Sequence, residues 1–154
     1  MENNRNELPV AIAGAGPVGL ALALGLARMG VRTVVFEAAA ELPPFSRAII
    51  VLTRTFEAFQ GWHIADRFVA EGTFLTKFSA YRADDNRPFI SFAFSALAGE
   101  TPKPGVVVLP QDRTEKILCD ELLKTGFSEV RFNHKVVGAL QDDSGVTIAI
   151  RPQN

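Results

Sequence analysis

The sequence has very little cysteine: Cys119 is the single one in 154 residues. One cysteine excludes an intrachain disulfide and is typical of a reducing compartment, so we expect a cytoplasmic protein. The net charge is −1, which provides no basic surface of the kind that binds nucleic acid. His63 and His134 lie far apart in the sequence with no metal-ligand spacing around either, so no metal site is predicted.

Charge is missing from residues 8–27, and this raises the possibility of a membrane span or an export signal. Three features argue against both. The preceding residues contain two acids and one arginine, the run contains glycines and Pro17, and the chain continues directly into the strand-like VRTVVFE. We therefore expect no membrane segment.

The glycines of the uncharged run have the spacing of a dinucleotide-binding loop. Gly14, Gly16 and Gly19 fall between a predicted strand at 8–14 and a predicted helix at 17–29, which is the context this motif requires. Gly14 would allow the tight turn, Gly16 would let a pyrophosphate approach the backbone, and Gly19 would let the helix pack on the strand. The predicted phosphate cradle comprises Gly14, Ala15, Gly16, Pro17, Val18 and Gly19.

An acid closes the second predicted strand, residues 31–37. The Glu37 carboxylate can accept hydrogen bonds from both hydroxyls of an adenosine ribose and would repel a 2′-phosphate, which favours FAD or NAD over NADP. Ala38 follows it and is included in the predicted site. The alternative is a glycine-rich turn with an ordinary surface glutamate.

The rest of the chain mixes helices with antiparallel strands. Helices are predicted at 53–59, at 64–70 and from Asp112 to Gly126, where Asp112 would be the N-cap and Glu115 would complete a capping box. Strands are predicted at 106–110 and 129–133, and hairpins at 73–94 and 134–152. The expected fold class is α/β: a Rossmann-like βαβ fold with an inserted β-hairpin and antiparallel strands.

Four segments follow one another along the chain: GAGPVGLALALGLARMGVRTVVFE, FSRAIIVLTRTFEAF, LPQDRTEKILCDELL and VVGALQDDSGVTIAI. Together, in this order, they resemble the FAD-dependent aromatic hydroxylases, also called class A flavoprotein monooxygenases. The proline-broken loop at 38–48 also favours FAD, since an NAD domain would continue into another helix and a third strand. The resemblance implies that FAD is reduced by NAD(P)H, reacts with O₂ and delivers one oxygen atom to a small aromatic substrate.

The resemblance also implies roles for residues outside the glycine loop. Arg47, followed by Ala48, matches an arginine that reaches the FAD phosphates or the flavin side. Gln111 matches a glutamine near the ribityl and diphosphate groups, and Arg113 is close enough in the sequence to join it. Val136 matches a strand residue whose backbone meets the adenine. The catalytic residues are unknown.

The same resemblance predicts that residues 1–154 are the N-terminal portion of an FAD-binding domain, truncated before the substrate domain is complete. Residues 73–105 would be a β-rich insertion on the substrate side. The remaining part would be a second chain or absent, or the chain would form a homo-oligomer. Two alternatives stay open: another FAD-dependent oxidoreductase with the same N-terminal half, and an incomplete nucleotide-binding fragment without activity of its own.

Overall fold

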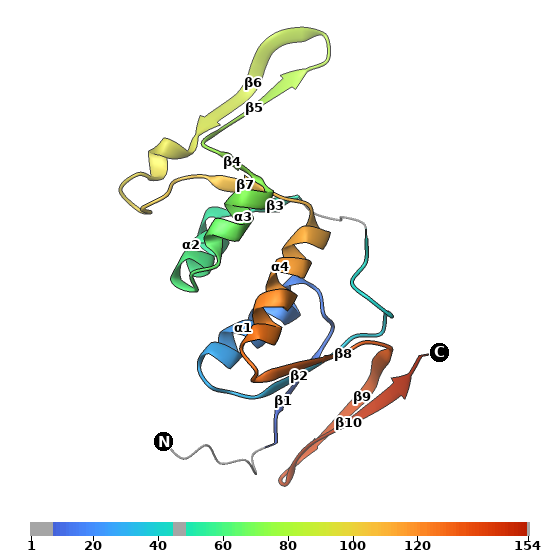
Figure 1. The fold of residues 1–154 in the computed structure, drawn as a ribbon. Coiled ribbons are helices and arrows are strands. Elements are labelled where there is room, and N and C mark those ends of the chain that lie inside the picture. The colour runs from blue at the N-terminus through green and yellow to red at the C-terminus, as the bar shows by residue number, and fades with distance from the viewer. Residues whose placement is uncertain (1–7, 45–48, 154) are drawn as a thin grey trace. The chain divides into compact units, whose positions relative to one another are not determined.

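The computed structural model describes residues 8–44 and 49–153, and in it the chain divides into two units, each with its own strands and helices (Figure 1). The first unit contains residues 8–44 and 114–153, and the second contains residues 49–113. The α/β fold class predicted from the sequence is confirmed.

A three-stranded parallel sheet organises the first unit. Its order is β1 (Val10–Ala13), β2 (Thr33–Phe36) and β8 (Ser128–Arg131), so the strand that follows the βα unit lies in the centre. Thr33 occupies the same register as Val10 on one side and Ser128 on the other, and the hydroxyl oxygens of Thr33 and Ser128 lie 2.7 Å apart. A parallel sheet of this kind brings the carboxyl ends of its strands to one edge, where ligands of such folds bind.

Helix α1 (Pro17–Arg28) connects β1 to β2 and buries one face against the sheet. The buried face consists of Leu20, Ala23, Leu24 and Ala27, which follow the 3.6-residue period, and each buried leucine contributes roughly 1.5–3 kcal/mol. Pro17 suits the first turn because its missing N–H would have no intrahelical partner there. Gly30, at φ +79°, ends the helix in the left-handed conformation, as predicted.

The uncharged run is thus divided between a strand, a glycine turn and a helix of 12 residues. Over the residues that the structure describes, none of the helices has both the length and the apolar character that crossing a bilayer requires.

A hairpin of β9 (His134–Asp142) and β10 (Gly145–Pro152) completes the first unit. It lies across the sheet from α1 and α4 (Gln111–Lys124), as Figure 1 shows. The turn falls where the sequence predicts it: the Asp142 carboxylate accepts hydrogen bonds from the backbone N–H of Ser144 at 2.8 Å and of Gly145 at 3.2 Å.

The second unit is built on short antiparallel strands and two helices. Its sheet has the order β3 (Ile50–Val51), β7 (Val106–Val108) and β4 (Thr73–Leu75), and its helices are α2 (Thr53–Gly61) and α3 (Ala65–Glu71). Phe56, Phe59 and Phe68 form its buried centre, with the Phe59 and Phe68 rings stacked at 4.5 Å.

The hairpin predicted at 73–94 is present over a shorter range, as β5 (Lys77–Arg82) and β6 (Asp85–Ala93), because residues 73–75 form β4 and pair with β7 instead. A short 3₁₀ helix, η1 (Phe94–Leu97), follows it where the sequence predicts only a loop.

The predicted capping box at Asp112 is wrong. Helix α4 already begins at Gln111, and the Pro110 carbonyl accepts a hydrogen bond from the Arg113 N–H at 3.1 Å. Asp112 therefore lies within the first turn of the helix rather than before it. Glu115 is 2 % exposed and belongs to the buried face of α4.

Candidate nucleotide-binding site

The glycine loop leaves the sheet at the carboxyl end of β1. Gly14 has φ +98°, a conformation that side-chain-bearing residues rarely adopt, and its N–H donates to the Phe36 carbonyl at 2.7 Å. The loop is therefore tied to the end of the central strand. The turn role predicted for Gly14 agrees with this geometry.

Gly16 and Gly19 differ in what surrounds them. A Cβ atom at Gly19 would meet the Gly14 carbonyl oxygen at 2.1 Å and the Ile12 Cγ2 atom at 3.4 Å, so this glycine is needed for α1 to pack on the loop and β1. A Cβ atom at Gly16 would meet nothing within 4 Å. The backbone at Gly16 is therefore open to an approaching group, as a phosphate cradle requires.

The N-terminus of α1 adds an electrostatic preference for anions. The Leu20 N–H makes the first helical hydrogen bond, to the Gly16 carbonyl at 3.0 Å, so the N–H groups of the preceding turn have no partner within the helix. These groups and the helix dipole present partial positive charge, and the first turn contains no acidic side chain that would oppose an anion.

The Glu37 carboxylate lies beside the glycine loop. Its Oε2 atom accepts a hydrogen bond from the Ala15 N–H at 2.8 Å, and its Oε1 atom accepts one from the Ala39 N–H at 2.8 Å. A carboxylate offers about four acceptor positions, so one on each oxygen remains for further donors. The Glu37 residue is half-buried, so part of it stays exposed beside the loop.

Main-chain hydrogen bonds fix the segment that carries Glu37. The Glu37 N–H donates to the Arg131 carbonyl at 2.9 Å, and the Glu37 carbonyl accepts from the His134 N–H at 2.7 Å. The Asn133 N–H donates to the Ala39 carbonyl at 2.9 Å. Asn133 is not among the site residues predicted from the sequence; its one signal there is an asparagine between two strand-like runs, which is typical of turns.

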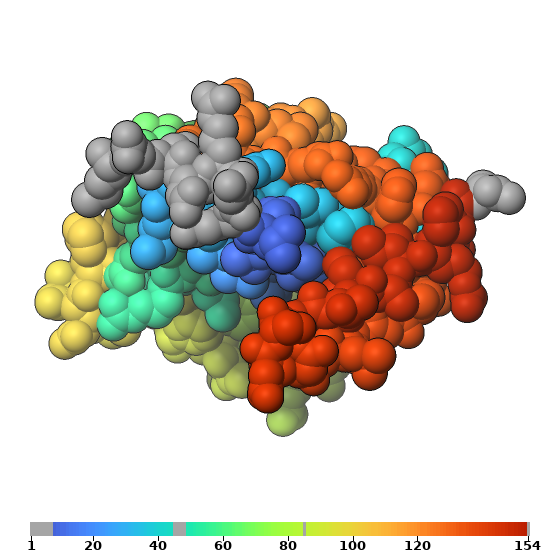
Figure 2. Space-filling view, turned by 90° about the horizontal axis from the view of Figure 1, so that it is seen from below, coloured from blue at the N-terminus to red at the C-terminus, as the bar shows by residue number. Residues whose placement is uncertain are grey.

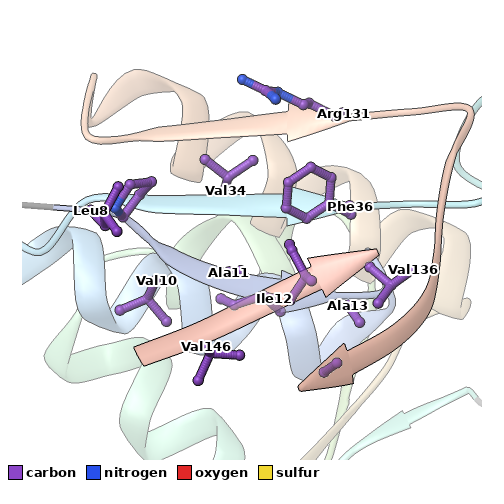
Figure 3. A pocket seen from close by; sticks show the side chains of 13 residues that line it. Leu8, Val10, Ala11, Ile12, Ala13, Val34, Phe36, Arg131, Val136 and Val146 are labelled. Atoms are coloured by element: carbon purple, nitrogen blue, oxygen red, sulfur yellow. The ribbon is translucent and has the colours of Figure 1, made fainter. Parts of the chain in front are cut away.

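Val136 lies in β9 and lines an apolar pocket of about 730 Å³ between the sheet and the β9–β10 hairpin (Figure 3). Ile12 and Phe36 contribute to its opposite wall, and Arg131 supplies its charged side chain. Figure 2 shows the hairpin, in red, beside the blue surface of β1. The glycine loop does not line this pocket, so we interpret it as an apolar face of the first unit and not as the phosphate site.

The remaining predicted residues are placed less completely. Arg47 and Ala48 lie outside the described residues. Gln111 and Arg113 occupy the first turn of α4, where the Arg113 guanidinium lies 4.0 Å from the Asp112 carboxylate and is more than half exposed. The structure thus brings the loop from Gly14 to Gly19 together with Glu37 and Ala38, and the cofactor-binding roles of all these predicted residues stay predictions.

Within residues 8–44 and 49–153, the other chemically active side chains form neither a metal centre nor a reactive thiol site. Over the described residues, no three side chains among His, Cys, Asp and Glu gather as metal ligands. Cys119 is 7 % exposed, and burial raises the pKa of its thiol, which keeps it protonated and unreactive. The open backbone at Gly16, the helix N-terminus and the Glu37 carboxylate together fit a dinucleotide.

Comparison with known proteins agrees with this geometry. A family profile described as an FAD binding domain matches residues 7–154. A 12-dehydrotetracycline 5-monooxygenase/anhydrotetracycline 6-monooxygenase of Streptomyces rimosus is 37% identical over 92% of this chain and 26% of its own length. The para-nitrophenol 4-monooxygenase of a Pseudomonas species is 30% identical over 90% of this chain and 34% of its own length.

Solved structures show the same fold. The p-nitrophenol 4-monooxygenase PnpA of Pseudomonas putida superposes with a TM-score of 0.86 at 30% identity, covering 94% of this chain and 36% of that one. A ternary complex of aklavinone-11 hydroxylase with FAD and aklavinone superposes with a TM-score of 0.80 at 33% identity, covering 96% of this chain and 30% of that one. The chain spans about a quarter to a third of the length of the relatives it matches.

Proposed function

The chain belongs to the FAD binding domain family, and we propose that it forms the FAD-binding part of an NAD(P)H-dependent monooxygenase that hydroxylates aromatic substrates. The observation that carries the proposal is the meeting of the glycine loop, the α1 N-terminus and the Glu37 carboxylate at the carboxyl edge of the sheet. When bound, FAD would supply the redox and oxygen chemistry; this chain's residues bind and orient it.

The loop residues from Ala15 to Gly19 each have a task in this proposal. The backbone of Ala15 and Gly16 would face the diphosphate, and the first-turn N–H groups of Val18 and Gly19 would face its negative charge. Pro17 starts the helix without an unpaired donor. Glu37 accepts hydrogen bonds from the ribose hydroxyls through its remaining acceptor positions.

Residues outside the loop complete the proposed cofactor site on the strength of the family resemblance. Arg47, with Ala48 beside it, would pair with the diphosphate, because a planar guanidinium matches phosphate oxygens. Gln111 and Arg113 would face the ribityl and diphosphate groups, and the backbone of Val136 would face the adenine.

The hairpin within residues 73–105 is proposed to belong to the substrate side. Phe78 and Phe92 are directly opposite each other in its register, with ring centroids 5.5 Å apart, and they are 42% and 48% exposed. An aromatic pair left this accessible offers a surface for an apolar ring. A cytoplasmic location would give the protein the NAD(P)H that the proposed reaction consumes.

The test is a titration of the purified chain with FAD, followed by flavin fluorescence and by the visible spectrum. We expect saturable binding near one FAD per chain. Glu37→Ala tests the proposed ribose contact, and Glu41→Ala is its matched control. Glu41→Ala removes an exposed acid from the segment after β2 and leaves the Glu37 carboxylate bonded to Ala15, so it should bind FAD as the wild type does.

A chain that retains no flavin colour after incubation with excess FAD and removal of the unbound cofactor would overturn the proposal and favour an incomplete fragment. Binding of FAD together with NAD(P)H oxidation that no aromatic compound stimulates would instead favour another FAD-dependent oxidoreductase. Oxygen uptake with formation of a hydroxylated aromatic product would support the monooxygenase assignment.

A further inference from the structure

A series of hydrogen bonds connects the glycine loop to the turn between β8 and β9. It begins at the Ala15 N–H, which donates to the Glu37 carboxylate, and the other oxygen of that carboxylate accepts from the Ala39 N–H. The Ala39 carbonyl then accepts from the Asn133 N–H at 2.9 Å. The phosphate loop is therefore held through Glu37 by a turn far away in the sequence.

Asn133, at the far end of this series of hydrogen bonds, has an unusual backbone conformation. Its backbone has φ +59°, in the left-handed region, and its carbonyl accepts a hydrogen bond from the Gln153 N–H at 2.8 Å. Both polar groups of its backbone are therefore used, one toward Ala39 and one toward the end of β10. The left-handed conformation aims them in these two directions. Asparagine and glycine adopt this conformation readily, whereas β-branched residues do so at high cost.

We propose that Asn133 is a positioning residue for the cofactor: its left-handed turn fixes the segment 37–39 and, through the Glu37 carboxylate, the amide of Ala15 in the phosphate loop. This inference rests on the proposed FAD site and adds a residue from outside the glycine motif that holds the geometry of that site. Asn133 acts through Glu37, so its loss should loosen the loop before any ligand is present.

Two substitutions at Asn133 change the backbone preference of the residue while both keep its N–H donor. Asn133→Gly keeps the N–H and tolerates positive φ, whereas Asn133→Val keeps the N–H but disfavours positive φ. His63, at φ +56° in the second unit, is the other described non-glycine residue with positive φ. His63→Val therefore imposes the same kind of backbone strain elsewhere and serves as the matched control.

The first measurement is hydrogen exchange of the Ala15 and Ala39 amides in the chain without FAD. We expect Asn133→Val to speed exchange at both amides by roughly tenfold, which corresponds to the cost of a left-handed backbone. Asn133→Gly should stay within about twofold of the wild type, and His63→Val should leave both amides unchanged. Equal exchange in the valine variant and the wild type would overturn the inference.

The second measurement is the FAD dissociation constant of the same four proteins. Asn133→Val should raise it by roughly tenfold, and neither Asn133→Gly nor His63→Val should change it more than about twofold. If the wild-type chain binds no FAD, the proposed function fails, while the exchange measurement still decides the role of Asn133. If His63→Val weakens FAD binding as much as Asn133→Val does, general strain explains the effect and the positioning role is refuted.

Discussion

Gly19 provides the strongest quantitative test of the α1 geometry. In Gly19→Ala, the new Cβ atom would lie 2.1 Å from the Gly14 carbonyl oxygen, far inside the 3.4 Å at which ordinary van der Waals contact begins. The obstacle is backbone, so no side-chain rotation can relieve it. Helix α1 must move away from β1, or the Gly14 turn must change.

The expected loss of stability follows from two opposing terms. Overpacking a fitted contact costs about 1–3 kcal/mol, and an overlap with rigid backbone belongs at the upper end of that range. Alanine regains up to about 1 kcal/mol over glycine within a helix. We therefore expect Gly19→Ala to lower the free energy of unfolding by about 2 kcal/mol, and the melting temperature by about 4–8 °C.

The measurement is urea denaturation followed by circular dichroism, with Gly16→Ala as the matched control. At Gly16 the new Cβ atom meets nothing within 4 Å and the backbone has φ −71°, so stability should stay within about 0.5 kcal/mol of the wild type. The same variant should nevertheless bind FAD more weakly, because its methyl group occupies the space proposed for the diphosphate.

Two outcomes would refute this reasoning. If Gly19→Ala is as stable as the wild type, then α1 does not pack on the loop as closely as the structure shows. If Gly16→Ala loses as much stability as Gly19→Ala, then the effect comes from the loss of glycine itself and not from the contact with the Gly14 carbonyl.

Three further predictions concern single side chains. Glu37→Ala should weaken FAD binding by about 1.5–3 kcal/mol in a fluorescence titration, and unchanged affinity would mean that the ribose lies elsewhere. Hydrogen bonds from the Ser144 hydroxyl and N–H hold the pKa of Asp142 below its ordinary value, so its stabilising effect is present above about pH 3.9 and is lost as the pH falls through the lowered value. The hydrogen-exchange protection factors of the β9–β10 hairpin, which correct for the intrinsic pH dependence of amide exchange, should therefore fall on acidification in the wild type, but much less in Asp142→Asn; parallel curves would contradict the assignment. Finally, burial raises the pKa of Cys119, so a thiol reagent at neutral pH should modify it far more slowly in the native chain than in urea, and equal rates would contradict its burial.

Local patterns in the sequence were sufficient for most of the first unit. The β1–α1–β2 order follows from apolar runs separated by glycines at functional spacing, and the left-handed Gly30 follows from its position just after the helix. The turn at Asp142 and Gly145 follows from the aspartate-rich, glycine-containing sequence between two strands of alternating apolar and polar residues. In each case the determining residues are neighbours in the chain.

The start of α4 was misplaced for a local reason. Aspartate is a preferred N-cap residue, but the helix begins one residue earlier, at Gln111, and the Pro110 carbonyl accepts a hydrogen bond from the Arg113 N–H.

Features set by distant residues were not predictable from local patterns. The role of Asn133 requires knowing that its N–H meets the Ala39 carbonyl, and no sequence periodicity encodes that contact. The division of the chain into two units likewise depends on how distant segments meet.

The acid at position 37 has a role in the fold that the glycine motif alone does not reveal. Its side chain faces two backbone donors, the N–H groups of Ala15 and Ala39, so it must present an acceptor oxygen to each. Glutamine would turn an NH₂ group toward one of them, and only a carboxylate satisfies both donors while keeping acceptor positions for ribose hydroxyls. An acid is therefore favoured at Glu37 by the fold as well as by the proposed cofactor. It follows that the carboxylate which would recognise the ribose is also the group that shapes the phosphate loop before FAD arrives.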